Sequence, residues 1–134
     1  MKSIYLAGRI GGLTLKDANA WRERVEKEFE GIAKCLNPLR GKKEEMRYRY
    51  TDGEIVIRDK NDIENSDIVL VYWKDKGNAP SVGTTMEVLY AHSLGIPVLF
   101  VGDWAANDIW MRYHVTKIYS ELDEAIEDIK AMWL

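Results

Sequence analysis

The residues with the clearest chemical potential lie in the segment from Ser81 to Ala91, where a carboxylate follows a turn of small residues. An apolar run from Ile68 to Trp73 predicts a buried strand before this turn, which contains Gly83 and Thr84. A strand, a glycine-containing turn and a helix N-terminus together present backbone N–H groups and the positive end of a helix dipole to an anion. Glu87 follows one helical turn later, with its side chain directed back toward the same mouth. The segment indicates chemistry on a phosphorylated or hydroxyl-rich ligand, with an ordinary surface glutamate as the simpler alternative.

Two other residues could act together with Glu87. Cleavage of a glycosidic bond can use one carboxylate as nucleophile and a second acid to protonate the leaving group. Glu87 suits the first role and Asp59 the second, while Tyr5, at the end of the first predicted strand, could orient Glu87 with a hydrogen bond. Asp62 and Asp67 compete with Asp59 for the acid role. Asp67 directly precedes an apolar strand, so it is as readily explained as a turn residue.

Familiar cofactor and metal motifs are missing. There is no Walker A sequence, and the glycines between Gly8 and Gly12 lack the full dinucleotide spacing. His92 and His114 have no second ligand at metal spacing, and solvent-facing or capping roles explain them better. No nucleophile-elbow serine is present. The sequence therefore predicts neither a cofactor nor a metal ion.

Length, charge and cysteine content limit the class of protein. A chain of 134 residues with 46% hydrophobic and 31% charged residues is expected to form a single domain over residues 1–134. The formal net charge of −3 gives no electrostatic reason to expect a nucleic-acid polymer as partner, whereas a single nucleotide needs only a local cradle. The only cysteine, Cys35, is interpreted as a buried structural thiol in a reducing cytoplasm. With no signal-peptide core and no membrane-spanning run, a cytoplasmic protein without membrane contact is expected.

Strand and helix patterns alternate along the whole chain. The expected strands are Ile4–Ala7, Ala33–Leu36, Ile68–Trp73, Pro97–Val101 and Val115–Tyr119, and the expected helices are Leu15–Phe29, Ile55–Asn65, Val82–Leu94 and Glu121–Trp133. This alternation predicts an α/β fold with three αβα layers and a five-stranded, mostly parallel sheet of the flavodoxin-like or Rossmann-like type. In such sheets ligands bind at the carboxyl ends of the strands. The loops Gly8–Gly12, Asn37–Arg40 and Lys74–Gly83 should meet there, close to Tyr5, Asp59 and Glu87.

Two segments rich in aromatic residues lie outside the expected strands and helices. The stretch from Arg40 to Tyr50 is basic, and a solvated loop or lid is preferred over a nucleic-acid patch because the whole chain is acidic. Trp104, Trp110 and Tyr113 lie in a segment of mixed character. Exposed aromatic residues there would suit contact between copies of the chain.

Three groups of residues carry a resemblance to a known family. They are Ile4-Tyr5-Leu6-Ala7-Gly8, then Arg58-Asp59 with Ile63 and Ser66-Asp67-Ile68, and finally Ser81-Val82-Gly83-Thr84-Thr85-Met86-Glu87 with Tyr90-Ala91 and Gly95-Ile96-Pro97-Val98. In this order and spacing, over nearly the whole chain, the sequence resembles the nucleoside 2-deoxyribosyltransferase superfamily. That superfamily includes base-exchanging transferases and 2'-deoxynucleoside 5'-monophosphate N-hydrolases.

The resemblance implies a role for each acidic candidate. Glu87 matches the family nucleophile, which forms a glycosyl-enzyme ester, and Tyr5 matches the tyrosine that positions it. Asp59 matches the aspartate that assists departure of the base. The spacing from Asp67 back to Asp59 reproduces that of the family, and the spacing to Asp62 does not, so Asp59 is preferred.

Ser81 separates the two branches of the family. Transferases similar to this chain usually carry aspartate six positions before the nucleophile (87 − 81 = 6), whereas the monophosphate hydrolases carry serine. A carboxylate there would repel a 5'-phosphate, while a hydroxyl at a helix N-terminus can donate to it. The residues expected to bind the phosphate are therefore Ser81, Gly83 and Thr84, with a loop that resembles the hydrolases' phosphate-binding loop: Gly8, Arg9, Ile10, Gly11 and Gly12. In this loop Arg9 replaces a small polar residue and Gly11 replaces an arginine.

The resulting hypothesis is an enzyme that cleaves the N-glycosidic bond of 2'-deoxynucleoside 5'-monophosphates, or of 2'-deoxynucleosides, with water resolving the intermediate. One alternative is a transferase that exchanges bases between deoxynucleosides. A second alternative is a non-catalytic nucleotide-binding domain, in which Asp59 would cap its helix. The resemblance also implies a homo-oligomer, a dimer or higher, whose clefts borrow residues from a neighbouring subunit.

Overall fold

The sheet is entirely parallel in the computed structural model, which describes residues 1–46, 49–75 and 77–134. Its strands are β1 (Ser3–Gly8), β2 (Lys34–Leu36), β3 (Ile68–Tyr72), β4 (Val98–Val101) and β5 (Lys117–Tyr119), in the order β2-β1-β3-β4-β5. Tyr5 pairs with Leu36 of β2 on one side and with Val69 of β3 on the other. The strand order reverses between β1 and β3, and this switch point is where parallel sheets bind ligands.

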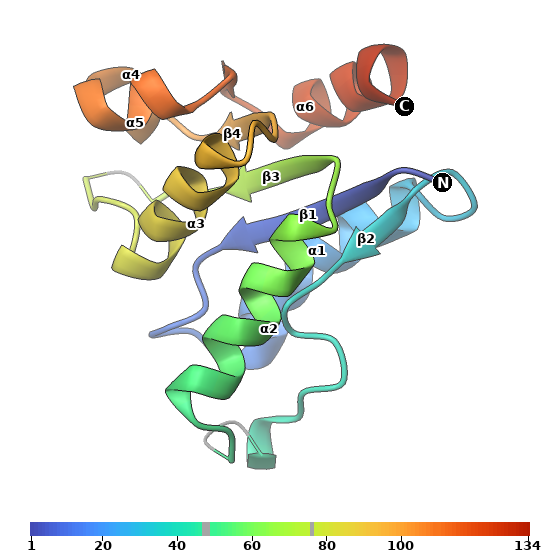
Figure 1. Cartoon of the computed structure of the whole chain (residues 1–134), viewed down its shortest axis with the longest axis vertical. Helices are drawn as coiled ribbons and strands as arrows, with labels where there is room; N and C mark the ends of the chain where they lie inside the picture. The colour runs from blue at the N-terminus through green and yellow to red at the C-terminus, as the bar shows by residue number, and fades with distance from the viewer. Residues whose placement is uncertain (47–48, 76) are drawn as a thin grey trace.

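Helices cover both faces of the sheet, so the predicted three-layer fold is confirmed. One face carries α1 (Leu15–Glu28) and α6 (Leu122–Asp128), the latter continued by a π-helical turn (Ile129–Trp133). The other face carries α2 (Asp52–Glu64), α3 (Val82–Ser93), α4 (Trp104–Asn107) and α5 (Ile109–His114). Figure 1 shows α2 and α3 in front of the sheet and α1 behind it. No helix within the described ranges has the length and apolar character needed to cross a membrane.

Some boundaries differ from those expected. Helix α2 begins at Asp52 rather than Ile55, because Thr51 and Glu54 form a capping box that satisfies the first backbone donors. The segment of mixed character contains two short helices, α4 and α5. In the stretch from Arg40 to Tyr50 the structure has a short 3-10 turn (Glu44–Met46), while residues 47 and 48 of that predicted lid lie outside the described residues.

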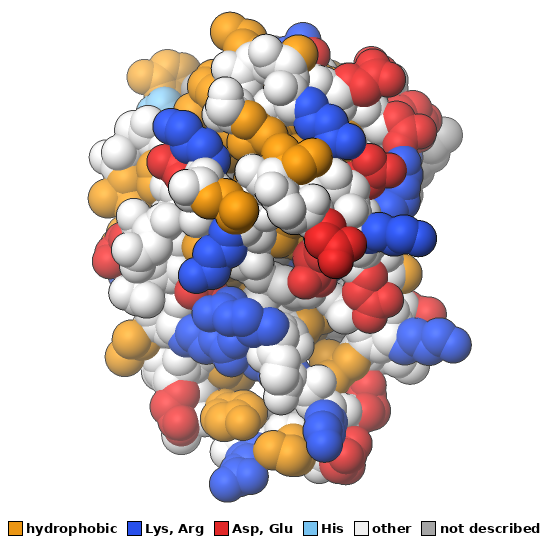
Figure 2. Space-filling model, turned by 90° about the vertical axis from the view of Figure 1, so that its right-hand side faces the viewer, with side chains coloured by type: hydrophobic (Ala, Val, Ile, Leu, Met, Phe, Trp, Pro, Cys, Tyr) orange, Lys and Arg blue, Asp and Glu red, His pale blue; other side chains and the backbone are white. Residues whose placement is uncertain are grey.

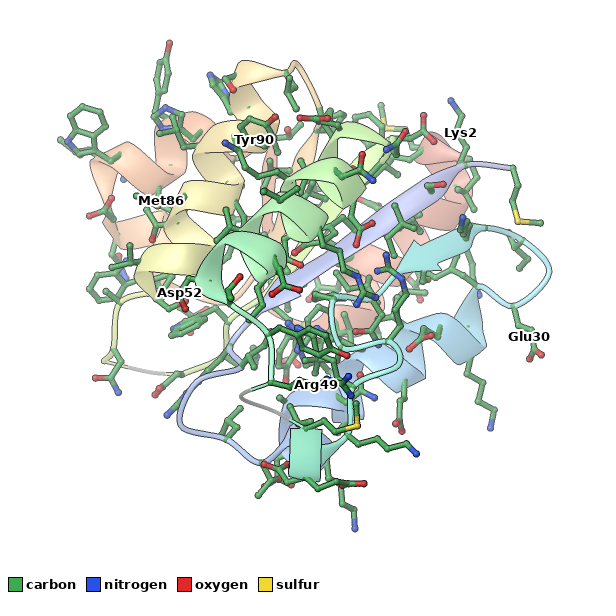
Figure 3. The ribbon with its side chains drawn as sticks, turned by 60° about the horizontal axis from the view of Figure 1, so that its bottom comes forward. Lys2, Glu30, Arg49, Asp52, Met86 and Tyr90 are labelled. Atoms are coloured by element: carbon green, nitrogen blue, oxygen red, sulfur yellow. The ribbon has the colours of Figure 1, made fainter. Side chains whose placement is uncertain are left out.

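Contacts between α2 and α3 hold the two site-bearing helices side by side. The Tyr90 hydroxyl of α3 donates a hydrogen bond to Glu64 of α2, and the Lys60 ammonium lies 4.7 Å from the centre of the Tyr90 ring. Figure 3 shows Tyr90 and Met86 along α3, beside the helix that begins at Asp52. On the face drawn in Figure 2, Asp and Glu side chains lie among Lys and Arg side chains.

Candidate active site

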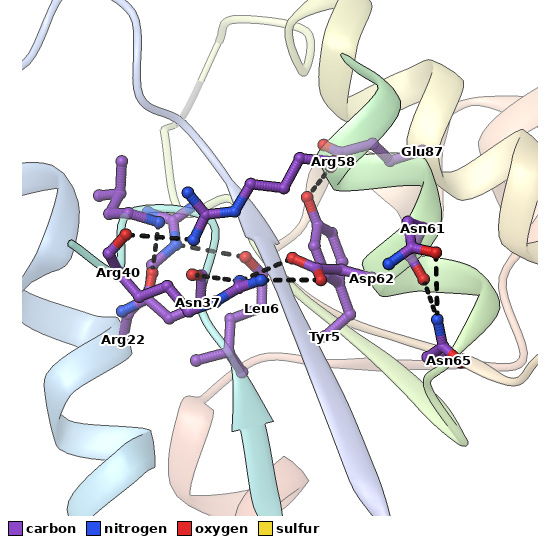
Figure 4. A network of polar contacts seen from close by, with 11 residues as sticks. Tyr5, Leu6, Arg22, Asn37, Arg40, Arg58, Asn61, Asp62, Asn65 and Glu87 are labelled. Carbon is purple, nitrogen blue, oxygen red and sulfur yellow. Dashed lines mark hydrogen bonds and ion pairs between the residues drawn. The ribbon is translucent and has the colours of Figure 1, made fainter. Parts of the chain in front are cut away.

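Tyr5 and Glu87 meet at the switch point of the sheet. The Tyr5 hydroxyl donates a hydrogen bond to Glu87 Oε2, as Figure 4 shows. Tyr5 is fully buried, and side chains alternate along β1, so it points to the same face of the sheet as α2 and α3. Glu87 lies in the second turn of α3, next to the buried Val88. The structure thus brings together two residues that the sequence places 82 positions apart.

The surroundings of Glu87 favour a carboxyl group that exchanges its proton near neutral pH. Burial raises the pKa of Glu87 to about 7, the Tyr5 hydrogen bond and Arg22 act in the opposite direction, and Asp59 raises it further. Burial, followed by the charge of Glu87, raises the pKa of Tyr5 well above its usual value. Tyr5 therefore remains a hydrogen-bond donor, and Glu87 is available as a carboxylate in a large fraction of molecules at pH 7.

Asp59 lies in the middle of α2 with one unpartnered oxygen. Its Oδ1 is buried and has no hydrogen-bond partner among the described residues. Burial raises the pKa of Asp59 to about 6, although the nearby cation of Lys42 lowers it. A buried polar atom without a partner is uncommon and needs an explanation such as a ligand or a catalytic proton. An acid with this pKa can release and regain a proton near neutral pH.

The competing aspartates have structural partners. Asp62 is buried and accepts two hydrogen bonds from the Arg40 guanidinium, at 2.6 and 2.9 Å. Asp67 Oδ2 accepts from the backbone N–H of Ser3 at 2.9 Å. The alternative that Asp59 caps its helix is wrong, because Thr51 is the N-cap of α2. Asp62 and Asp67 thus have partners within the fold, whereas Asp59 Oδ1 has none among the described residues.

The N-terminus of α3 presents the residues predicted to hold a phosphate. Ser81 is the N-cap, and its Oγ accepts from the backbone N–H of Thr84 at 3.2 Å and lies 3.0 Å from Thr84 Oγ1. The Thr84 side chain is buried, whereas Ser81 and Gly83 are exposed and open space surrounds Gly83. An anion could approach Ser81 and Gly83 from solvent, while Thr84 supports the cap.

The backbone and side chains of the loop after β1, residues 8–12, are held by close contacts. A Cβ atom on Gly8 would lie 2.7 Å from the Tyr72 carbonyl oxygen, so β1 and β3 can approach this closely only with glycine. Arg9 forms an ion pair with Asp75 at 3.1 Å and donates to the Gly11 carbonyl at 3.1 Å. Gly12 has a φ of 79°, which favours glycine. A phosphate bound by this loop would therefore share Arg9 with Asp75.

Two cations near the acidic residues were not predicted from the sequence. Lys42 is partly buried and acts on Asp59, while Arg22 is fully buried and acts on Tyr5, Glu87 and Asp59. The sequence carried a signal for Arg22, because a helical stripe that contains Ala18 and Val25 also contains position 22. Lys42 left no such signal, since its loop position depends on the tertiary fold.

Other candidates lie away from this cluster. A hollow of about 260 Å³ lies between α3 and α5, against residues that include Leu89, Trp104 and Met111, and does not border Tyr5, Asp59 or Glu87. Burial raises the pKa of Cys35 to about 12, so this side chain is a thiol rather than a nucleophilic thiolate at neutral pH. In residues 1–46, 49–75 and 77–134 no three His, Cys, Asp or Glu side chains are grouped to hold a metal ion.

Comparisons with known proteins agree with this fold. The family model described as nucleoside 2-deoxyribosyltransferase matches residues 4–123. A 2-desoxiribosyltransferase from Leishmania mexicana has a TM-score of 0.74 at 15% identity, covering 100% of both chains. A 2-deoxyribosyltransferase from Bacillus psychrosaccharolyticus has a TM-score of 0.72 at 16% identity, covering 92% of this chain and 90% of the other. The CMP N-glycosidase BcmB from Clostridium botulinum has a TM-score of 0.61 at 14% identity, covering 97% and 99%.

A search of curated proteins finds no match to this sequence. The structural neighbours are similar in fold alone at this level of identity, whereas the family model spans most of the chain. The chain therefore belongs to the nucleoside 2-deoxyribosyltransferase family, a family of enzymes that act on the glycosidic bond of nucleosides.

Proposed function

We propose that this protein hydrolyses the N-glycosidic bond of 2'-deoxynucleoside 5'-monophosphates, or of 2'-deoxynucleosides, through a covalent deoxyribosyl ester on Glu87. The observation that carries the proposal is the hydrogen bond from Tyr5 to the inward-facing carboxyl group of Glu87. The unpartnered oxygen of Asp59 in the same acidic cluster adds a second functional group. A nucleophile and an acid are the two parts that glycosidic cleavage requires.

In the first step the Glu87 carboxylate attacks C1' of the deoxyribose. A bond forms between Glu87 Oε and C1', and the bond from C1' to the base nitrogen breaks, with its electron pair leaving on the base. Protonated Asp59 donates its proton to the departing base, which leaves neutral. Tyr5 keeps its proton and holds Glu87 through the hydrogen bond, so the attacking oxygen is oriented before the substrate arrives.

In the second step water attacks C1' of the ester. The bond between C1' and Glu87 breaks with its electron pair on the glutamate, and the carboxylate is regenerated. Ionised Asp59 accepts a proton from the water, which restores the acid for the next turnover. The products are the free base and 2-deoxyribose, with its 5'-phosphate where the substrate carried one.

The substrate phosphate is assigned to the N-terminus of α3. Ser81 and Gly83 are exposed there, so an anion can reach this helix N-terminus from solvent, and a helix N-terminus favours a bound anion. Serine rather than aspartate at position 81 removes a repulsive charge. A neighbour whose name is CMP N-glycosidase supports a nucleoside monophosphate as substrate class. In this proposal Gly8, Arg9, Ile10, Gly11 and Gly12 approach the phosphate from the side of β1.

A transferase is the alternative that the family favours. Two structural neighbours are named 2-deoxyribosyltransferases, and the first step is the same in both reactions. The reactions differ only in whether water or a second base attacks the ester. Neither reaction requires a cofactor.

The test incubates the protein with each deoxynucleoside monophosphate, and separately with deoxynucleosides plus a second free base, followed by chromatography. Free base and deoxyribose phosphate are expected from the monophosphates. A new nucleoside in the second mixture supports the transferase, and intact nucleotide recovered in both supports a non-catalytic binding domain. Glu87→Ala should lower the rate at least ~10³-fold, a typical loss for a removed nucleophile. Glu127→Gln, an exposed glutamate of α6 on the opposite face of the sheet, is the matched control. Mass spectrometry with a 2-fluoro-2-deoxy analogue should place the adduct on Glu87.

We also propose a cytoplasmic homo-oligomer, a dimer or higher, with shared active sites. Large apolar side chains of α3 and α5 are exposed at Val82, Met86, Leu89, Ile109, Trp110 and Tyr113. Monomeric proteins rarely expose so much contiguous apolar surface, and a second copy would bury it. Light scattering at micromolar concentration should give at least twice the monomer mass. A monomeric mass would contradict this part of the proposal.

A further inference from the structure

Arg22 is a buried cation without a carboxylate partner. It lies on α1 with 0% of its surface exposed, and it is the largest of the fully buried side chains. None of the ion pairs among the described residues includes it. Buried charges are costly unless they are paired and hydrogen-bonded, so an arginine in this position needs a reason.

The first part of the reason is the open edge of β1. Strand β2 ends at Leu36, opposite Tyr5, so the carbonyl groups further along β1 have no strand partner on this side. Arg22 takes the place of the missing strand: its Nε donates to the Leu6 carbonyl at 3.2 Å and its Nη2 to the Gly8 carbonyl at 3.1 Å. A third bond runs from Nη1 to the Ala18 carbonyl at 2.5 Å. Figure 4 shows Arg22 between α1 and this part of β1.

The second part of the reason is charge. The carbonyl oxygens satisfy the N–H groups of Arg22 but carry no net charge. Burial lowers the pKa of Arg22 to about 10, so the guanidinium is still charged at neutral pH, and the carboxyl groups that act on it are those of Glu87 and Asp59. The guanidinium lies 4.7 Å from the centre of the Trp21 ring, and the negative charge that opposes it comes from the acidic cluster on the other face of the sheet.

Other charged groups around the cluster act elsewhere. Tyr5 of β1 and Asp59 of α2 face Glu87, but neither brings a positive charge. The cations near Asp59 are Lys42, Arg58 and Arg40. Arg40 is engaged by Asp62, and the Arg58 side chain donates to the Arg40 carbonyl at 3.1 Å. For Glu87 the opposing positive charge comes from Arg22.

We propose that Arg22 is a positioning residue that supplies the counter-charge of Glu87 and fixes the carboxyl end of β1 next to Tyr5. The inference rests on the proposed function, in which Glu87 must be ionised to attack. The same charge favours the second step, because Glu87 then leaves C1' as a carboxylate. Arg22 does this without touching the substrate.

The test is a titration of Glu87 in folded protein without substrate. Protein labelled with ¹³C at the glutamate carboxyl group is titrated by NMR, and Glu87→Gln identifies the signal. Arg22→Met and Arg22→Gln, which remove the charge, are expected to raise the pKa of Glu87 by half a unit or more, which makes it an acid at least ~3-fold weaker. Arg22→Lys, which keeps the charge, should leave that pKa within half a unit of the wild-type value. Arg24→Met, two positions along on the exposed side of α1, is the matched control and should leave it unchanged.

A neutral variant that folds and changes the pKa of Glu87 by less than half a unit would overturn the inference. Where neither neutral variant folds, the reciprocal measurement decides: Glu87→Gln should lower the pKa of the Arg22 guanidinium, followed by NMR of ¹³C-labelled arginine, and an unchanged pKa of Arg22 overturns the inference. Because no substrate is used, an inactive protein with the expected shifts would refute the proposed function alone. In an active protein the acid limb of kcat/KM should move by the same amount as the titration.

Discussion

The two faces of the sheet are built in different ways. On the face of α1 and α6, charged side chains at the surface are paired, as in the ion pairs Lys130–Glu28 at 3.0 Å and Lys117–Asp128 at 2.7 Å, above a closed apolar core. On the face of α2, α3 and α5, Asp59 has a buried oxygen without a partner in the described part of the chain, and several large apolar side chains are exposed. Both faces contain buried residues from the same strands, so the difference lies in the helices.

This difference separates residues that stabilise the fold from residues that serve a ligand or a second copy. Where each polar group has a partner, stability alone explains the residue types. A buried acid without a hydrogen-bond partner and a large apolar side chain exposed to solvent do not stabilise the fold, so stability does not explain these residues. Arg22 links the two faces: it lies on α1, on one face, and its charge acts on Glu87, on the other.

The largest expected effect on stability is on the face of α1 and α6, and it tests whether the two faces are separable. Phe29 is fully buried beside Val25 and Ile129, and Phe29→Ala should lower the free energy of unfolding by about 3–5 kcal/mol because it leaves a cavity. Denaturant unfolding measures the loss, and the pKa of Glu87 should stay unchanged. A shift of that pKa in the folded variant would mean that the two faces are not separable.

A smaller effect distinguishes two aspartates of the same helix. Asp59→Asn should lower kcat roughly 100-fold with little change in stability, because it removes a proton donor whose Oδ1 has no partner among the described side chains. Asp62→Asn should lower stability by about 1–2 kcal/mol, since it breaks a hydrogen-bonded ion pair with a partly exposed Arg40. Steady-state kinetics and unfolding curves on both variants check the contrast. The reverse pattern would exchange their roles.

The last predicted effect concerns Glu87 itself and nearly vanishes at low pH. Its pKa of about 7 in the folded protein lies above the value in an unfolded chain, so the protonated form is favoured by folding. This contribution to stability is present at pH values below about 4 and is lost as the pH rises through 7. Glu87→Gln mimics the protonated form, so it should be more stable than the wild type by about 2 kcal/mol at pH 8 and nearly equal at pH 4.

Unfolding by denaturant at pH 4 and pH 8 measures this difference. Phe29→Ala serves as the control, because its loss of apolar packing should be similar at both pH values. If Glu87→Gln shows the same difference from the wild type at pH 4 and pH 8, Glu87 does not titrate as proposed.

Much of the fold follows from local patterns. The five apolar runs became the five strands, and the expected helix Val82–Leu94 became α3, which Ser81 caps and after which Gly95 has a φ of 74°. The short helices α4 and α5 were missed, because four and six residues are too few to show a helical period. The residues expected to converge, Tyr5 and Glu87, do so through a direct hydrogen bond.

Residue types and spacing were sufficient to predict strands, helices and the acidic candidates, since alternation and helical period are local properties of a chain. The choice between Asp59 and Asp62 was different: the sequence favours Asp59 only through a family resemblance. The structural basis of this choice is that the Arg40 guanidinium donates two hydrogen bonds to Asp62, so Asp62 already has a partner. Likewise, Arg22 becomes a counter-charge only because β2 ends early and leaves the carbonyls of β1 open. Burial and unbalanced charge depend on which distant segments pack together, and for that reason only the tertiary structure decides them.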